Sequence, residues 1–131
     1  MAIVLDASAL IAKLTSNEEF AQEIEDLTEN NLVIAPDVIL LEVISGLYKM
    51  SLRKEISSQF FKSTYLQVSQ QDITLVPSKD IIPQIDDLLG NITAYDASYV
   101  NLARKLNIPL CTIDKKLANS ASRYCEVIYC E

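Results

Sequence analysis

Short apolar runs alternate with longer stretches of helical periodicity along almost the whole chain. Five runs have the composition and length typical of buried strands. They are Ile3–Leu5, Leu32–Ala35, Ile73–Val76, Leu110–Thr112 and Glu126–Tyr129. Because helix-period segments separate them, the alternation predicts an α/β fold with three α/β/α layers and a central parallel sheet of about five strands.

Polar caps and chain breakers mark the expected helix ends. Ser16-Asn17 predicts a helix that runs to about Thr28, and Thr93 predicts one from Ala94 to Leu106 that Asn107-Ile108-Pro109 ends. Further helices are expected from Pro36-Asp37 to about Leu52, roughly from Lys54 to Ser69, roughly from Lys79 to Leu89, and briefly after Asp114.

The size and composition of the chain favour one domain. It has 131 residues, half of them hydrophobic, so we expect a single domain over residues 1–131. The start lacks a basic region and reaches Asp6 too early for a signal peptide, and no apolar run is long enough to cross a membrane. The odd set Cys111, Cys125 and Cys130 fits reduced thiols in a cytoplasmic protein, although a Cys125–Cys130 disulfide is conceivable in an oxidising setting.

Four acidic residues stand where an apolar segment stops or inside one. An ionised carboxylate beside core-forming residues is costly to desolvate unless a positive group compensates it. A hard divalent cation is the obvious compensator, and an all-oxygen ligand set suits Mg²⁺ or Mn²⁺ better than Zn²⁺. The four residues are Asp6, Glu42, Asp96 and Asp114.

Charge and the absent histidine narrow the chemistry further. Without histidine there is no Ser-His-Asp triad, Cys-His pair or histidine base, so any hydrolysis is expected to use metal-activated water. The net charge of −7 argues against broad, nonspecific nucleic-acid binding, but two divalent ions bound in an acidic pocket would roughly cancel four of those charges. Lys13, Lys115 and Lys116 are weak candidates for phosphate contacts, and a solvated surface position is the favoured interpretation of each.

Each acid also has a structural interpretation. Asp6 and Asp114 could merely cap the helices that follow them, and Asp96 could serve only its helix dipole. Glu42 needs a partner within an apolar stretch, which could be a basic residue in an ion pair. The basic candidates are Lys49, Arg53 and Arg104. One metal site at the carboxyl edge of the sheet would explain all four acids together.

At these residues the chain resembles the PIN-domain nucleases, and most closely the small VapC-type toxins of prokaryotic toxin–antitoxin pairs. The resemblance runs nearly from end to end. Four motifs, each weak alone, occur in order at suitable separations. They are Ile3-Val4-Leu5-Asp6-Ala7-Ser8-Ala9-Leu10, Pro36-Asp37-Val38-Ile39-Leu40-Leu41-Glu42-Val43, Tyr95-Asp96-Ala97-Ser98-Tyr99 with Leu102-Ala103, and Leu110-Cys111-Thr112-Ile113-Asp114-Lys115-Lys116-Leu117.

The resemblance implies an endoribonuclease that depends on one or two Mg²⁺ or Mn²⁺ ions. Carried over by motif, the catalytic and metal-binding quartet is Asp6, Glu42, Asp96 and Asp114, with Ser8 and Thr112 as supporting hydroxyl residues. We expect Asp6 and Asp96 to hold the tightest ion, with the other two acids completing its shell directly or through water.

The resemblance also implies partners. Such proteins act on RNA, are usually homodimers and are held inactive by a cognate, VapB-like antitoxin. A strongly acidic chain suits a basic partner, and an antitoxin arginine could enter the carboxylate pocket in place of a metal ion.

Two other classes of function remain open. A receiver-like signalling domain also binds Mg²⁺ in an acidic pocket, but it would need paired acids at the first strand, where only Asp6 stands. The place two residues after Asp6 is Ser8, which also disfavours an aspartyl-nucleophile phosphatase. A catalytically inert interaction domain that has kept the fold is the third possibility.

Overall fold

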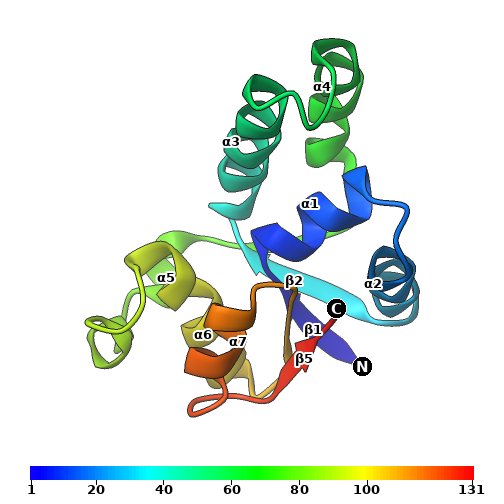
Figure 1. Cartoon of the computed structure of the whole chain (residues 1–131). Coiled ribbons are helices and arrows are strands. Elements are labelled where there is room, and N and C mark those ends of the chain that lie inside the picture. The colour runs from blue at the N-terminus through cyan, green and yellow to red at the C-terminus, as the bar shows by residue number, and fades with distance from the viewer.

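In the computed structural model, which describes residues 1–131, five parallel strands form one sheet in the order β3-β2-β1-β4-β5. Figure 1 labels β1, β2 and β5 of this sheet. The sheet confirms the predicted α/β class. Each strand overlaps its predicted run within about a residue: β1 (Ala2–Leu5), β2 (Leu32–Pro36), β3 (Thr74–Val76), β4 (Leu110–Thr112) and β5 (Val127–Tyr129). In the central pair, Leu5 lies opposite Cys111.

Helices cover both faces of the sheet. On one face α1 (Ala7–Thr15) packs against α2 (Glu19–Asn30) and α3 (Ile39–Leu52), and α3 continues into a hairpin with α4 (Ser58–Thr64) (Figure 1). The other face carries α5 (Ser78–Ile81), α6 (Ala94–Leu106) and α7 (Lys115–Ala121), with α6 against β1, β2 and β4. This is the arrangement that right-handed crossovers produce when the chain reverses its direction across the sheet.

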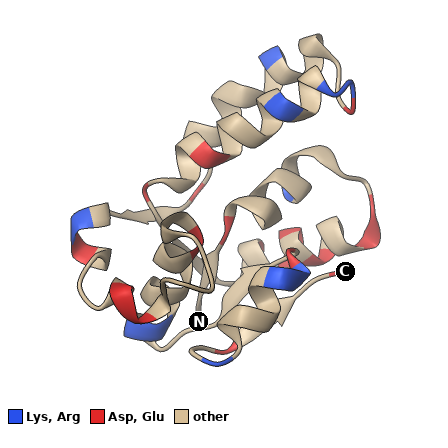
Figure 2. Ribbon diagram, turned by 60° about the vertical axis from the view of Figure 1, so that its left-hand side comes forward, with Lys and Arg blue, Asp and Glu red and all other residues tan.

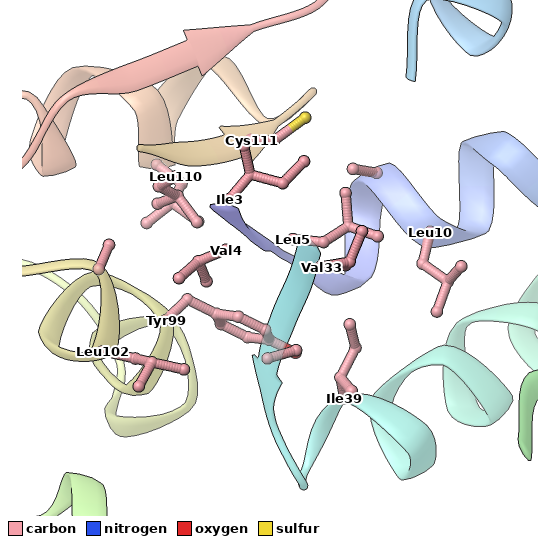
Figure 3. Close-up of a cluster of buried hydrophobic side chains, with 14 of the residues drawn as sticks. Ile3, Val4, Leu5, Leu10, Val33, Ile39, Tyr99, Leu102, Leu110 and Cys111 are labelled. Atoms are coloured by element: carbon pink, nitrogen blue, oxygen red, sulfur yellow. The ribbon is translucent and has the colours of Figure 1, made fainter. Parts of the chain in front are cut away.

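The core lies on both sides of β1. Ile3, Val4 and Leu5 are at most 2% exposed, which explains why this strand reads as a continuous apolar run. Figure 3 shows side chains from α1, α3 and α6 converging on it, among them Leu10, Ile39 and Tyr99. Burial on both faces fixes the position of the strand end that carries Asp6.

Two predicted helices are interrupted. The helix expected over Lys54 to Ser69 begins only at Ser58, capped by the Ser57 hydroxyl, and passes into the 3-10 helix η1 (Tyr65–Gln70). The one expected over Lys79 to Leu89 is divided into α5 and the 3-10 helix η2 (Ile85–Leu88), because Pro83 cannot donate its hydrogen bond and Gln84 takes a left-handed φ of 70°.

The remaining sequence expectations concern caps, cysteines and membrane spans. Thr93 and Asn107 bound α6 as predicted, with Thr93 Oγ1 accepting from the backbone N–H of Asp96. All three cysteine thiols are free, and burial raises the pKa of Cys125 to about 11. None of the helices combines the length and the apolar character that crossing a bilayer requires.

Candidate active site at the carboxyl edge of the sheet

The site forms where the chain changes direction across the sheet. From β1 the chain proceeds to β2 and β3 on one side, whereas β4 and β5 lie on the other side of β1. Asp6 follows β1 and Asp114 follows β4 by two residues, so both stand at this switch point. Crevices at such points are the usual ligand sites of open parallel sheets.

Asp6 is the most tightly held of the four acids. Its Oδ1 accepts hydrogen bonds from Ser8 Oγ (2.7 Å) and the Ala9 N–H (2.9 Å), and its Oδ2 accepts one from Thr112 Oγ1 (2.5 Å). The carboxylate therefore also caps α1, as the structural interpretation of Asp6 predicted. Burial raises the pKa of Asp6 to about 6, although the three donors oppose that shift.

The two predicted hydroxyl residues join the ends of β1 and β4. Ser8 Oγ lies 3.2 Å from Thr112 Oγ1 and accepts the Ile113 N–H at 3.3 Å. Thr112 Oγ1 in turn accepts the Asp114 N–H at 3.0 Å. This network ties the backbone that carries Asp114 to the carboxylate of Asp6.

Glu42 is held by an aromatic hydroxyl. It lies in the first turn of α3, and its Oε1 accepts a hydrogen bond from Tyr99 Oη at 2.5 Å. Tyr99 belongs to α6 and is 1% exposed; burial, followed by its contact with Glu42, raises the pKa of its hydroxyl well above the usual range. The ion pair considered for Glu42 is absent, since Arg104 instead lies 3.7 Å from Asp87.

Tyr99 was missed by sequence reasoning as a functional residue. It forms part of the motif around Asp96, but only as a component of the family pattern. The available signal was its spacing: it lies three residues after Asp96, on the inward face of a helix, where a buried phenol needs a hydrogen-bond acceptor.

Asp96 and Asp114 share an open cavity of about 340 Å³. Its walls also include Gly90, Asn91, Ile92, Thr93, Lys116 and Leu117. Asp114 Oδ1 caps α7 by accepting the Leu117 N–H at 3.1 Å, whereas the Asp96 carboxylate accepts no hydrogen bond from the protein. Partial burial, then the charges of Asp114 and Glu42, raise the pKa of Asp96. The ionised form of Asp96 is therefore disfavoured by the negative charges of two other acids of the quartet, Asp114 and Glu42.

The donor set matches a hard divalent cation in chemistry. All four side chains offer carboxylate oxygens and none has a basic partner, because the single ion pair in the structure joins Arg104 to Asp87. No three His, Cys, Asp or Glu side chains stand close enough together to enclose an ion. Mg²⁺ commonly binds proteins through one or two carboxylates and keeps several waters, so the open arrangement fits a partly hydrated ion.

The candidate phosphate-binding lysines are separated in space. Lys116 lines the cavity of Asp96 and Asp114, and Lys115 is exposed next to it on α7. Lys13 lies elsewhere: its Nζ donates to Gln71 Oε1 at 3.2 Å, and it lines a different cavity near Ser16 and Glu18.

Comparison with known proteins gives a consistent family match. The model of the family described as "PIN domain" matches residues 3–122. The ribonuclease VapC1 of Mycobacterium tuberculosis is 30% identical over 95% of this chain and 94% of its own length. The VapC ribonuclease Mb0985 of Mycobacterium bovis is 29% identical over 95% of each chain.

Solved structures show the same fold. VapC20 of Mycobacterium tuberculosis, described as a sarcin-ricin loop cleaving toxin, superposes with a TM-score of 0.67 at 16% identity and covers 95% of this chain and 98% of its own. VapBC2 of Rickettsia felis, solved bound to a DNA fragment from its promoter, gives a TM-score of 0.66 at 13% identity, with both chains fully covered.

Proposed function

Because this chain belongs to the PIN domain family, we propose that it is a metal-dependent endoribonuclease and the toxin of a VapBC-type pair, working as a single domain over residues 1–131 in the cytoplasm. One observation carries the proposal. Four carboxylates lie around the switch point of a parallel sheet, and none of them forms an ion pair with a basic residue. Their charge is unfavourable for the folded protein unless a ligand offsets it.

The acids divide the work between them. Asp96 and Asp114 present oxygens to the open cavity, where a phosphate approaches beside Lys116. Ser8 and Thr112 fix the orientation of Asp6, and Tyr99 fixes that of Glu42. A divalent ion held by these carboxylates would lower the pKa of a bound water and would neutralise charge on the scissile phosphate.

PIN-domain ribonucleases are metal-dependent in general. We propose Mg²⁺ or Mn²⁺ as the ion, in one or two copies, since oxygen-only donors suit both. Of the quartet, Asp96 has the carboxylate with no protein donor, and we assign it the central position in binding the metal.

A VapB-like antitoxin and a second copy of the chain are the proposed protein partners. Two of the similar solved structures, VapBC2 of Rickettsia felis and FitAB, are described as bound to DNA fragments. A candidate surface lies beside Glu42, where Leu41 (71% exposed) and Tyr95 (60% exposed) line the same cavity, and Tyr95 also lines an adjoining apolar groove. Light scattering at micromolar concentration is expected to give a dimer that Tyr95→Glu weakens and the remote Leu66→Glu does not. A monomeric wild type would contradict the homodimer.

The receiver-like domain and the inert interaction domain are distinguished from a nuclease by different observations. The family match and the single acid at the end of β1 disfavour the receiver-like domain. Phosphorylation of this protein by acetyl phosphate would instead support the receiver-like domain. An inert interaction domain would keep the fold without turnover, so activity alone distinguishes it.

The decisive experiment is RNA cleavage. Antitoxin-free protein is incubated with total cellular RNA and Mg²⁺ or Mn²⁺, and the new RNA ends are sequenced. Discrete cleavage that EDTA and Asp96→Asn both abolish supports the proposal. If the protein is folded and binds Mn²⁺ as measured by calorimetry, but the RNA stays intact, the inert interaction domain would be favoured.

A further inference from the structure

The cavity of Asp96 and Asp114 does not end at the acids. A second cavity of about 250 Å³ adjoins it, and the two share Asn91 and Ile92 in their walls. Its remaining lining comes from Leu88, Asn119, Ser120, Arg123 and Tyr124. Together the two cavities form a cleft, here called the α7 cleft, that runs from the acids along α7.

One side of the α7 cleft is formed by polar residues that lie on the same face of α7. Lys116, Asn119 and Ser120 follow one another at intervals of three and one, which places them on one face of α7. Arg123 lies in the turn after the helix, which ends at Ala121. Figure 2 shows basic positions at the start of α7 and in the turn that follows it.

The two basic side chains of this cleft have no partners inside the protein. Neither Lys116 nor Arg123 makes a hydrogen bond or an ion pair, although both are exposed in a chain of net charge −7. Arg104 shows the contrast: it donates to Gln84 O at 3.0 Å and to Asn101 Oδ1 at 2.7 Å. Two unpaired cations in a cleft that begins at Asp96 and Asp114 are free to receive an anionic ligand.

An aromatic ring stands at the far end. Tyr124 is half-buried, and the Arg104 guanidinium carbon lies 5.9 Å from its ring centroid. Arg104 therefore fixes the ring while Tyr124 also lines the α7 cleft. Cationic grooves with aromatic platforms are the general means of binding single-stranded nucleic acids, whose bases stack on the rings.

We propose that the α7 cleft binds the single-stranded RNA segment next to the scissile phosphate, an inference that rests on the proposed function. Lys116 and Arg123 bind successive phosphates, the Asn91 and Asn119 amides reach ribose or base edges, and a base packs against Tyr124. A duplex would turn its bases inward, so these small cavities and the ring suit unpaired nucleotides.

Binding measurements with matched variants test this path. The probe is a fluorescein-labelled pool of random 12-nucleotide single-stranded RNA, with all proteins in the Asp96→Asn background so that the probe stays intact. Arg123→Ala is expected to weaken binding about two- to fivefold, as for one exposed ion pair, and to reduce the slope of log K against log[salt] by about 0.7. Arg123→Lys should keep the slope. Arg53→Ala, which removes an exposed arginine from the end of α3, should change neither quantity.

Cross-linking with 4-thiouridine RNA gives a second readout, expected at Asn91, Asn119 or Tyr124. An unchanged salt slope in Arg123→Ala, cross-links confined to the Glu42 side near Lys49, or absence of RNA binding would each overturn the α7 cleft. Failure of the proposed function looks different, because it is absence of EDTA-sensitive cleavage by the wild-type protein whatever its binding of RNA.

Discussion

Asp6 and Asp114 follow strands, whereas Glu42 and Asp96 project from helices, and the two pairs are held in different ways. At the strand ends, Ser8, Thr112 and backbone N–H groups satisfy the carboxylate oxygens. On the helices, one phenol binds Glu42 and nothing in the protein binds the Asp96 carboxylate. The strand side of the site is fixed by the fold, and the helix side keeps its capacity for a ligand.

The difference predicts that removing charge on the helix side affects turnover and leaves folding intact. Asp96→Asn should lower RNA cleavage by more than about 100-fold, beyond the range typical of residues that only orient a metal ligand. Its melting temperature in EDTA should not fall, because the substitution removes repulsion from Asp114 and Glu42. The exposed Asp86→Asn is the control. An active Asp96→Asn, or one that unfolds, would remove the distinction between the two sides.

On the strand side, ionisation of Asp6 should change the free energy of unfolding with pH. Burial holds the pKa of Asp6 at about 6 in the folded protein, against an ordinary value of 3.8 for an aspartate carboxyl group. Between these values the folded protein keeps a proton that the unfolded chain releases, so the contribution of Asp6 is greatest at low pH. It falls as pH rises from about 4 to about 6, by up to about 3 kcal/mol.

Urea unfolding in EDTA checks this sign. The stability of Asp6→Asn relative to wild type should rise between pH 4 and pH 7, while the exposed Asp72→Asn should parallel wild type throughout. Parallel profiles for Asp6→Asn would mean that the carboxylate is solvated.

Removing the Thr112 hydroxyl tests the strand-side hydrogen bonds without changing the charge of the site. Thr112→Val should lower the free energy of unfolding by about 2 kcal/mol, since it removes a buried donor to Asp6 and an acceptor for the Asp114 N–H. Thr74→Val, at an exposed position of β3, is the matched control for the loss of a hydroxyl. Equal stability of the two variants would mean that the strand network adds nothing to folding.

The smallest expected effect concerns the one hydrogen bond on the helix side. Tyr99→Phe should lower cleavage about tenfold by releasing Glu42, and should lower the free energy of unfolding by about 1 kcal/mol. Tyr95→Phe, whose hydroxyl has no partner in the protein, should match wild type in both assays. Unchanged cleavage by Tyr99→Phe would show that Glu42 needs no positioning by this phenol.

Local signals made part of this structure predictable. Apolar runs predicted the strands, Thr93 and Asn107 bounded α6, and the family motifs named the acids before their positions were known. Pro83 also carried a usable signal for the break between α5 and η2, which helical periodicity outweighed.

Long-range pairings were not predictable from these local signals. The bond between Tyr99 and Glu42 joins residues 57 positions apart on different helices, and Lys13 meets Gln71 across a similar separation. The joining of two cavities at Asn91 and Ile92 likewise depends on how the loop before α6 lies against α7. Such contacts follow from packing, which no window of sequence contains.

The pairing of β1 with β4 has a consequence during synthesis. Asp6 leaves the ribosome more than a hundred residues before its partner Thr112 and the neighbouring Asp114. Because the central strand pair cannot close before then, an emerging nascent chain holds only fragments of the site. The site therefore cannot be assembled during synthesis until β4 has left the ribosome, so the ribosome that makes this protein does not meet a working nuclease before that point.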